Sequence, residues 1–250
     1  MHLCRFRHTS SRDLAPWPVF ALLFCAALAA PIPSKEKSQV PLARWDEQQP
    51  GCTFSQGRDG KYNYGLWSGD VGVTLSVDSQ ELEKVHRRHE PFFGVLLTIR
   101  YRGQGSLEVD SQNVSFEFVK HFKFVQTSLD PDNFSAKIQN DADELDHQTA
   151  REIAKHPEQK EAKQAYMRAF QKDSAELIEF VSKNSLRPAQ LDAANPEVSG
   201  WVLFNTSSKW IGGWKKQEEF VLRFPLDGKI FEFPFKLPPK QGEHLLRRRE

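Results

Sequence analysis

Two histidines and a glutamate stand close enough together in the sequence to raise the question of a metal site. They occur in the order His86-Arg87-Arg88-His89-Glu90. Zinc hydrolases carry His-Glu-x-x-His, or the inverted His-x-x-Glu-His, on a helix, so that both imidazoles face one ion. The order here matches neither pattern, and Pro91 disfavours a helix before it. We therefore predict a solvated loop, with no metal and no cofactor.

Other residues with reactive side chains have equally incomplete patterns. Glu144 and His147 have the spacing of half a di-iron helix motif, but a second copy is missing. The segment from Asp130 to Asn133 lacks the glycine and the distal glutamate of a calcium loop. A Ser-His-Asp triad is assembled in space, so the sequence leaves that possibility open. We predict no catalytic residue, and we keep a hydrolase, with its site where sheets and helices meet, as an alternative.

The segment from Thr206 to Lys216 is the best candidate for a binding site. It holds Trp210 and Trp214 beside Lys209 and Lys215. Indole rings exposed in a loop stack on sugars or anchor a protein, whereas buried rings complete a core. Both alternatives stay open, and we expect at least Trp214 to be buried because it lies nearer to the next strand. A glycan-binding module that uses both tryptophans is the second alternative function.

The elements that position these residues are mostly strands. Between residues 199 and 237, aromatic and aliphatic side chains alternate with other residues in three runs, with Val202 and Phe204 on one side of the first run and Trp201 and Leu203 on the other. Asp227-Gly228 separates the second and third runs and favours a tight hairpin turn. Alternating runs also occur over 62–66, 71–77, 92–102 and 114–124, with no helix between them. This pattern predicts a mainly β fold, an immunoglobulin-like antiparallel β-sandwich.

The period of the apolar residues changes to a helical one in the middle of the chain. Ala142, Leu145 and Ile153 recur at helical spacing, and Pro157 breaks the pattern. A second apolar stripe follows, comprising Tyr166, Phe170, Leu177 and Val181. We predict an α-helical hairpin inserted into the sandwich at about residues 136–186.

The start of the chain has the pattern of an export signal. Arg5, Arg7 and Arg12 precede a short apolar run that ends in small residues near Ala29. The run is shorter than the roughly 20 residues that a membrane span needs. Removing residues 1–29 takes away a net charge of +2 and two of three cysteines, which leaves a net charge of −1 and Cys52. That near-neutral charge offers no electrostatic basis for binding nucleic acid or acidic lipid.

These observations define the predicted organisation and function. We expect a signal peptide over 1–29, a flexible linker over 30–50, the sandwich over 51–239 and a charged tail over 240–250.

The segments Gly200-Trp201-Val202-Leu203-Phe204 and Glu219-Phe220-Val221-Leu222-Arg223 resemble exported bacterial modules of immunoglobulin type. The resemblance implies a binding or scaffold role outside the cytoplasm and transfers no catalytic residue. We predict a secreted or periplasmic protein whose partner is a protein or a glycan of the cell envelope, with membrane contact only through the signal segment. The sequons at Asn113, Asn133 and Asn205 matter only in a eukaryotic source.

Overall fold

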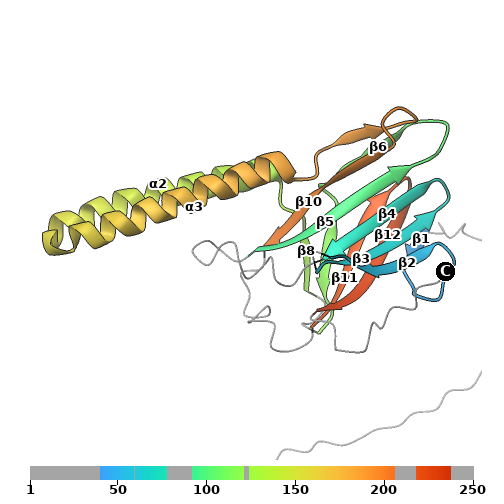
Figure 1. The fold of residues 1–250 in the computed structure, drawn as a ribbon, viewed down its shortest axis with the longest axis horizontal. Coiled ribbons are helices and arrows are strands. Elements are labelled where there is room, and N and C mark those ends of the chain that lie inside the picture. The colour runs from blue at the N-terminus through green and yellow to red at the C-terminus, as the bar shows by residue number, and fades with distance from the viewer. Residues whose placement is uncertain (1–39, 59, 78–91, 121–123, 206–217, 238–250) are drawn as a thin grey trace, which may run out of the picture. The chain divides into compact units, whose positions relative to one another are not determined.

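The computed structural model describes residues 40–58, 60–77, 92–120, 124–205 and 218–237. All described residues belong to one compact unit, Gln39–Glu250. The predicted signal peptide and charged tail therefore lie outside the described residues. The described part is mainly β, with two five-stranded sheets, a small third sheet and one helical hairpin (Figure 1).

The first sheet has the strand order β10-β5-β4-β3-β2, and every neighbouring pair is antiparallel. Its strands are β2 (Cys52–Gln56), β3 (Tyr62–Ser68), β4 (Val71–Val77), β5 (Phe92–Tyr101) and β10 (Glu197–Asn205). Apolar residues alternate along β3, β4, β5 and β10, as the sequence predicts, and along β2, where alternation was not predicted, so that one face of the sheet is buried.

The second sheet has the order β1-β12-β11-β7-β8. Its strands are β1 (Leu42–Arg44), β7 (Ser115–Phe118), β8 (Phe124–Thr127), β11 (Glu218–Leu226) and β12 (Lys229–Leu237). β1 pairs with β12 in parallel, so this sheet is not wholly antiparallel. The turn between β11 and β12 is the predicted one: Asp227 and Gly228 both have positive φ, at 54° and 66°. Positive φ at both central residues is the geometry that a two-residue hairpin favours.

The two large sheets share one hydrophobic core, which is rich in phenylalanine. Phe116 of β7 is its centre: the ring lies 4.7 Å from that of Phe93 in β5 and 5.1 Å from those of Phe204 and Phe220, measured between centroids. Phe93 and Phe204 belong to the first sheet, and Phe116 and Phe220 to the second. Stacked rings thus join the two sheets directly.

The predicted linker includes a segment that belongs to the fold. Leu42–Arg44 forms β1, and Trp45, which follows it, is only 9% exposed. Its indole packs edge-on against Tyr64 at 5.0 Å, and its Nε1 donates to the carbonyl oxygen of Thr53. The prediction of a flexible linker over 30–50 is therefore wrong for residues 42–45, because this segment gains its structure by pairing with the far end of the chain.

Two short strands, β6 (Leu107–Val109) and β9 (Ala189–Leu191), form the third sheet. Leu107, Val109 and Leu191 are buried in the core that the two large sheets share. The small sheet therefore extends that core rather than forming a separate one.

The helical hairpin consists of α2 (Pro131–Lys155), a 3₁₀ turn η1 (Pro157–Gln159) and α3 (Lys160–Asn184). The hairpin and its break at Pro157 are as predicted, but α2 begins five residues before the expected start at 136. Each helix has 25 residues and is about 37 Å long. Figure 1 shows the two helices running side by side away from the sheets.

The apolar stripe of α3 packs largely as predicted. Phe170, Leu177 and Val181 are buried, together with Met167. Tyr166 differs from the prediction, because 48% of it is exposed. A pair of helices has no third layer to cover its flanks, and Tyr166 lies on such a flank, with its ring stacked 6.3 Å from that of Phe170.

Candidate functional site at the root of the helical hairpin

Strand β10 carries the hairpin on its outer edge. The chain that enters the hairpin donates from the backbone N–H of Leu129 to the carbonyl oxygen of Leu203, at 2.7 Å. The chain that leaves it donates from Leu186 to the carbonyl oxygen of Trp201, at 2.9 Å. A side chain on Gly200 would collide with the backbone of Leu186, so this close approach requires glycine. Both stems of the hairpin are therefore bonded to one strand, and they occupy the edge that it would otherwise offer to another chain.

Both faces of β10 are used. Val202 and Phe204 point into the core between the sheets, while Leu203 belongs to a second cluster at the root of the hairpin. The fully buried members of that cluster are Ile138, Leu177, Val181 and Leu203. The two-sided pattern of β10 was visible in the sequence, and the hairpin explains why its second face is also apolar.

Half-buried aromatic pairs flank this root cluster. Phe180 lies 5.7 Å from Trp201, and Phe92 lies 5.4 Å from Phe134, between ring centroids. Each pair joins a helix to a strand of the first sheet. The helices are thus fixed to the sheet by aromatic contacts as well as by the stems.

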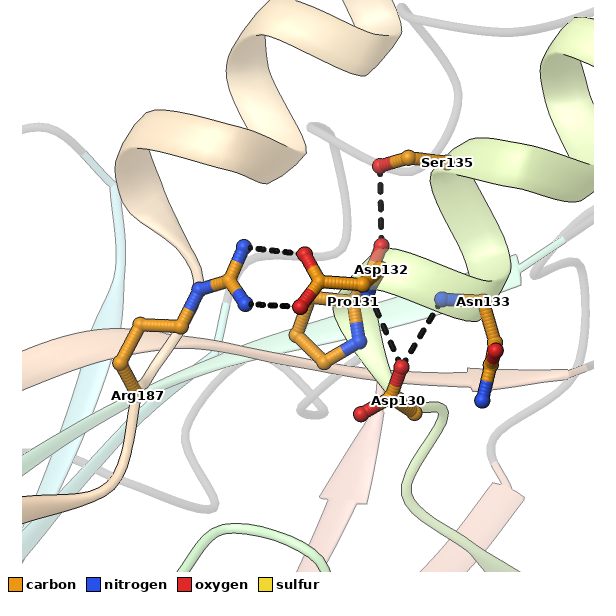
Figure 2. Close-up of polar contacts among 6 residues, drawn as sticks. All are labelled: Asp130, Pro131, Asp132, Asn133, Ser135 and Arg187. Carbon is orange, nitrogen blue, oxygen red and sulfur yellow. Dashed lines mark hydrogen bonds and ion pairs between the residues drawn. The ribbon is translucent and has the colours of Figure 1, made fainter.

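Polar contacts define where α2 begins (Figure 2). Asp130 is the N-cap residue, and its Oδ1 accepts from the backbone N–H groups of Asp132 and Asn133 at 3.1 and 2.8 Å. Pro131 follows at the first helical position, where its fixed φ suits the helix and its missing N–H costs nothing. An Asp-Pro pair before a helix is a recognised start signal, so the true start of the hairpin was readable from the sequence.

Asp132 and Arg187 close the base of the hairpin. The two terminal guanidinium nitrogens of Arg187, Nη1 and Nη2, donate to the two carboxylate oxygens of Asp132, each at 2.8 Å (Figure 2). Arg187 lies just beyond the end of α3, so this pair joins the first turn of one helix to the exit of the other. The hydrogen bonds from Arg187 lower the pKa of Asp132 below its ordinary value, and those to Asp132 raise the pKa of Arg187. The carboxylate also lies at the N-terminus of α2, where negative charge is favoured.

Beyond the root, the two helices contact mainly each other. Ala142 of α2 and Ser174, Phe170 and Met167 of α3 are buried between them. The buried positions of α3 recur at alternating intervals of three and four residues, which is the spacing of helices that pack like a coiled coil. Near the tip, Lys163 donates to Glu152 at 2.9 Å, and this bond lowers the pKa of Glu152. The hairpin is therefore attached to the sheets at one end only, as far as the described residues show. We call it the arm, and we call the line of buried contacts between its two helices the seam.

The surface of this arm is charged and polar. On α2 the side chains of Asp143, Glu144, Asp146 and His147 are all exposed. Glu144 accepts a hydrogen bond from Gln148 at 3.0 Å, and Asp143 accepts one from Gln139 at 2.9 Å. The predicted exposed pair of Glu144 and His147 is thus found in solvent on the middle of α2.

A second charge network lies on the outer face of the other sheet. Arg223 of β11 donates to Glu117 and to Glu232, at 2.5 and 2.7 Å, and Arg44 of β1 lies 3.0 Å from Glu232. Burial opposes the charged form of Arg223, but the bonds to both carboxylates outweigh it and raise its pKa. The network ties four strands together and leaves Glu232 only 4% exposed, so its role is to join β1 to the sheet.

The residues predicted to bind a ligand lie outside the described part of the chain. Trp210, Trp214, Lys209 and Lys215 fall within 206–217, and His86 and His89 within 78–91. The described ends of the tryptophan segment are Asn205 in β10 and Glu218 in β11, which belong to different sheets.

The root of the hairpin is built mainly from apolar side chains and backbone hydrogen bonds. Within the described residues, no group of three or more His, Cys, Asp or Glu could hold a metal ion. Cys52 is half-buried and accepts a long hydrogen bond from the backbone of Asp46. Around the root most described side chains are apolar; the polar ones include Asp130, the buried Ser185 and the Asp132–Arg187 pair. A root of this kind can hold the arm in one position relative to the sheet, with the polar surface of the helices exposed.

Comparison with known proteins gives no relative. No family model, no curated protein and no solved structure matches this chain. Among the described helices, none has both the length and the apolar composition that crossing a membrane requires.

Proposed function

We propose that this chain is an exported, non-catalytic binding or scaffold protein of the cell envelope or extracellular space. In this proposal the two large sheets form an immunoglobulin-like sandwich, and the sandwich presents the α2–α3 arm to a protein partner. The proposal of export rests on the pattern of residues 1–29.

The observation that carries the proposal is the way the arm is held. Its root is fixed by the backbone hydrogen bonds of Leu129 and Leu186 to β10, by the apolar root cluster, and by the bidentate ion pair of Asp132 and Arg187. Among the described residues, its outer part packs along its own seam, and most of its other side chains are exposed. When a rigid element binds a partner, few of its side chains and no loops need to become ordered, which lowers the entropic cost of association.

The hydrolase alternative finds less support at this junction. Most of the described side chains there are apolar, the carboxylate of Asp130 caps α2, and that of Asp132 is held by Arg187. Acid–base catalysis needs a donor or acceptor within hydrogen-bond reach of a substrate. The glycan-binding alternative through Trp210 and Trp214 remains a prediction about residues outside the described part.

Photo-crosslinking in cells of the source organism tests the proposed function. A photoreactive residue replaces Gln148 or Gln164, both exposed on the arm, and as a matched control Thr127, exposed on β8. We expect one protein to be crosslinked from both arm positions and not from Thr127. Equal labelling from all three positions, or none from the arm, would count against an arm that recognises a partner.

A further inference from the structure

The outer face of the first sheet carries a group of small, uncharged polar side chains. Tyr64, Val73 and Leu97 point into the core, so the residues that alternate with them point outward. We call the resulting set the polar strip; it comprises Thr53, Ser55, Asn63, Thr74, Thr98 and Ser199. All six are half-buried or exposed.

The register of the strands brings these side chains together. Ser199 pairs with Thr98, Thr98 with Thr74, and Thr74 with Gly65, which in turn pairs with Thr53. This row therefore crosses all five strands of the sheet. The hydroxyl oxygens of Thr98 and Ser199 lie 2.9 Å apart. Hydroxyl and amide groups can both donate and accept, which is the requirement for binding the hydroxyl groups of a sugar.

Two tryptophans stand at opposite borders of the strip, and each lies over a glycine. A methyl group on Gly72 would fall 2.6 Å from Cε2 and 2.7 Å from Cδ2 and Cζ2 of Trp67. A methyl group on Gly94 would fall 3.2 Å from Cε3 of Trp201. Because Gly72 is almost equally far from three ring atoms of Trp67, that indole lies with its flat side on the sheet. Both indoles are half-buried.

A cation lies over each of these rings. The guanidinium carbon of Arg102 is 4.5 Å from the ring centroid of Trp67, and Nζ of Lys61 is 6.0 Å from that of Trp201. The backbone of Gly72 covers one side of the Trp67 ring, so the cation stands on the outward side. The Arg102 side chain is largely exposed. A cation on a long, solvated side chain can move aside and donate to a ligand that stacks on the ring.

The middle of this face is uncharged, which favours a neutral ligand, and the arginines at its border, Arg100 and Arg102, each lie beside a carboxylate. The polar strip itself contains no charged residue, and the charged pair Arg100–Glu197 lies one row beyond it. A nucleic acid would need a basic surface, and a protein interface would need an apolar centre. Trp201 in β10 and Trp67 in β3 are three strands apart in the sheet, which is about 14 Å. That span has room for several sugar rings.

We propose that the outer face of the first sheet binds a neutral glycan chain, laid across the polar strip between Trp67 and Trp201. This surface is made by residues of the sheet and not of the arm, which it meets only at Trp201 among the described residues. The proposal therefore goes beyond the proposed function and can fail without it.

Affinity electrophoresis and calorimetry with the full chain test the proposal. The probes are neutral glucans, mannan, galactan, xylan and chitin oligosaccharides, with polygalacturonate as the anionic comparison. Ser199→Arg and Thr53→Arg each place a long charged side chain in the strip. Thr127→Arg is the matched control, because it makes the same change on the outer face of the other sheet. Thr98→Ala adds a variant that removes only one hydroxyl group.

We expect at least one neutral glycan to bind. Ser199→Arg and Thr53→Arg should weaken that binding at least tenfold, Thr98→Ala should weaken it less, and Thr127→Arg should leave it unchanged. Failure of every neutral glycan to bind would overturn the proposal, as would binding of polygalacturonate alone. Binding that survives both arginine variants but is lost in Trp210→Ala with Trp214→Ala would overturn it and assign the sugar to that segment.

Discussion

Arg187 and Asp132 lie 55 positions apart in the sequence, yet both oxygens of the carboxylate accept from the guanidinium group at 2.8 Å. This pair joins the first turn of α2 to the segment that follows α3. It therefore fixes the two ends of the hairpin relative to each other at the point where the arm meets the sheets.

The first prediction concerns the pH dependence of this pair. The pKa of Asp132 is lowered by its hydrogen bonds to Arg187, so the pair stabilises the fold above the unfolded-state pKa of aspartate. That contribution is lost as the pH falls through the lower, folded-state pKa. Arg187→Met should return the pKa of Asp132 towards its ordinary value, as NMR titration of the carboxyl carbon would show. Lys183→Met, which removes a neighbouring helix pair, is the control. An unchanged Asp132 titration in Arg187→Met would show that the pair does not persist in solution.

The second prediction concerns the packing of the arm. Leu177 is fully buried and belongs to the root cluster, and Phe170 is buried along the seam. Leu177→Ala should cost about 2–5 kcal/mol and Phe170→Ala about 3–5 kcal/mol, because each leaves a cavity. Tyr166→Ala is the control, and with an exposed side chain it should change stability by less than about 1 kcal/mol. Denaturant titration measures all three. Equal effects of Phe170→Ala and Tyr166→Ala would show that Phe170 is not buried between the helices.

The third prediction concerns β1. Trp45 packs on Tyr64 and Phe54 and hydrogen-bonds Thr53, although it lies in a stretch that reads as a linker. Trp45→Ala should destabilise the fold by about 3–5 kcal/mol, as for other large buried side chains. Gln48→Ala, in the exposed turn that follows, should have little effect. A denaturant midpoint for Trp45→Ala that matches that of the unmutated protein would show that β1 does not hold to β12 in solution.

What the sequence predicted and what it missed have a common physical cause. Alternation along β3 to β5 and β10 to β12 is a local signal, and those strands were predicted. β1 has three residues and gains its hydrogen bonds from β12, so nothing local marks it as a strand. The start of α2 had a local signal in Asp130-Pro131, but the same residues also read as a turn after a strand. The root of the hairpin depends on contacts between β10 and two distant helices, which no single stretch of sequence contains.

The fourth prediction concerns the tryptophan segment, which lies outside the described residues. If Trp210 and Trp214 recognise a partner, each Trp→Ala change should leave stability nearly unchanged and weaken binding by at least about 2 kcal/mol. If they complete a core, the same changes should destabilise the protein by several kcal/mol. Iodide quenching of single-tryptophan variants distinguishes the two outcomes. Two fully protected rings would remove the segment as a binding site.

The most direct test of the proposed function shortens the arm without disturbing its root. Deleting residues 143–149 and 166–172 removes seven residues from each helix, which keeps the seam in phase and shortens the arm by about 10 Å. The partner identified by crosslinking is then titrated against the full-length and shortened proteins. The account predicts a shortened protein that unfolds cooperatively and binds at least about 30-fold more weakly, a loss of about 2 kcal/mol. Unchanged affinity for the shortened protein would contradict the claim that the arm is the binding element.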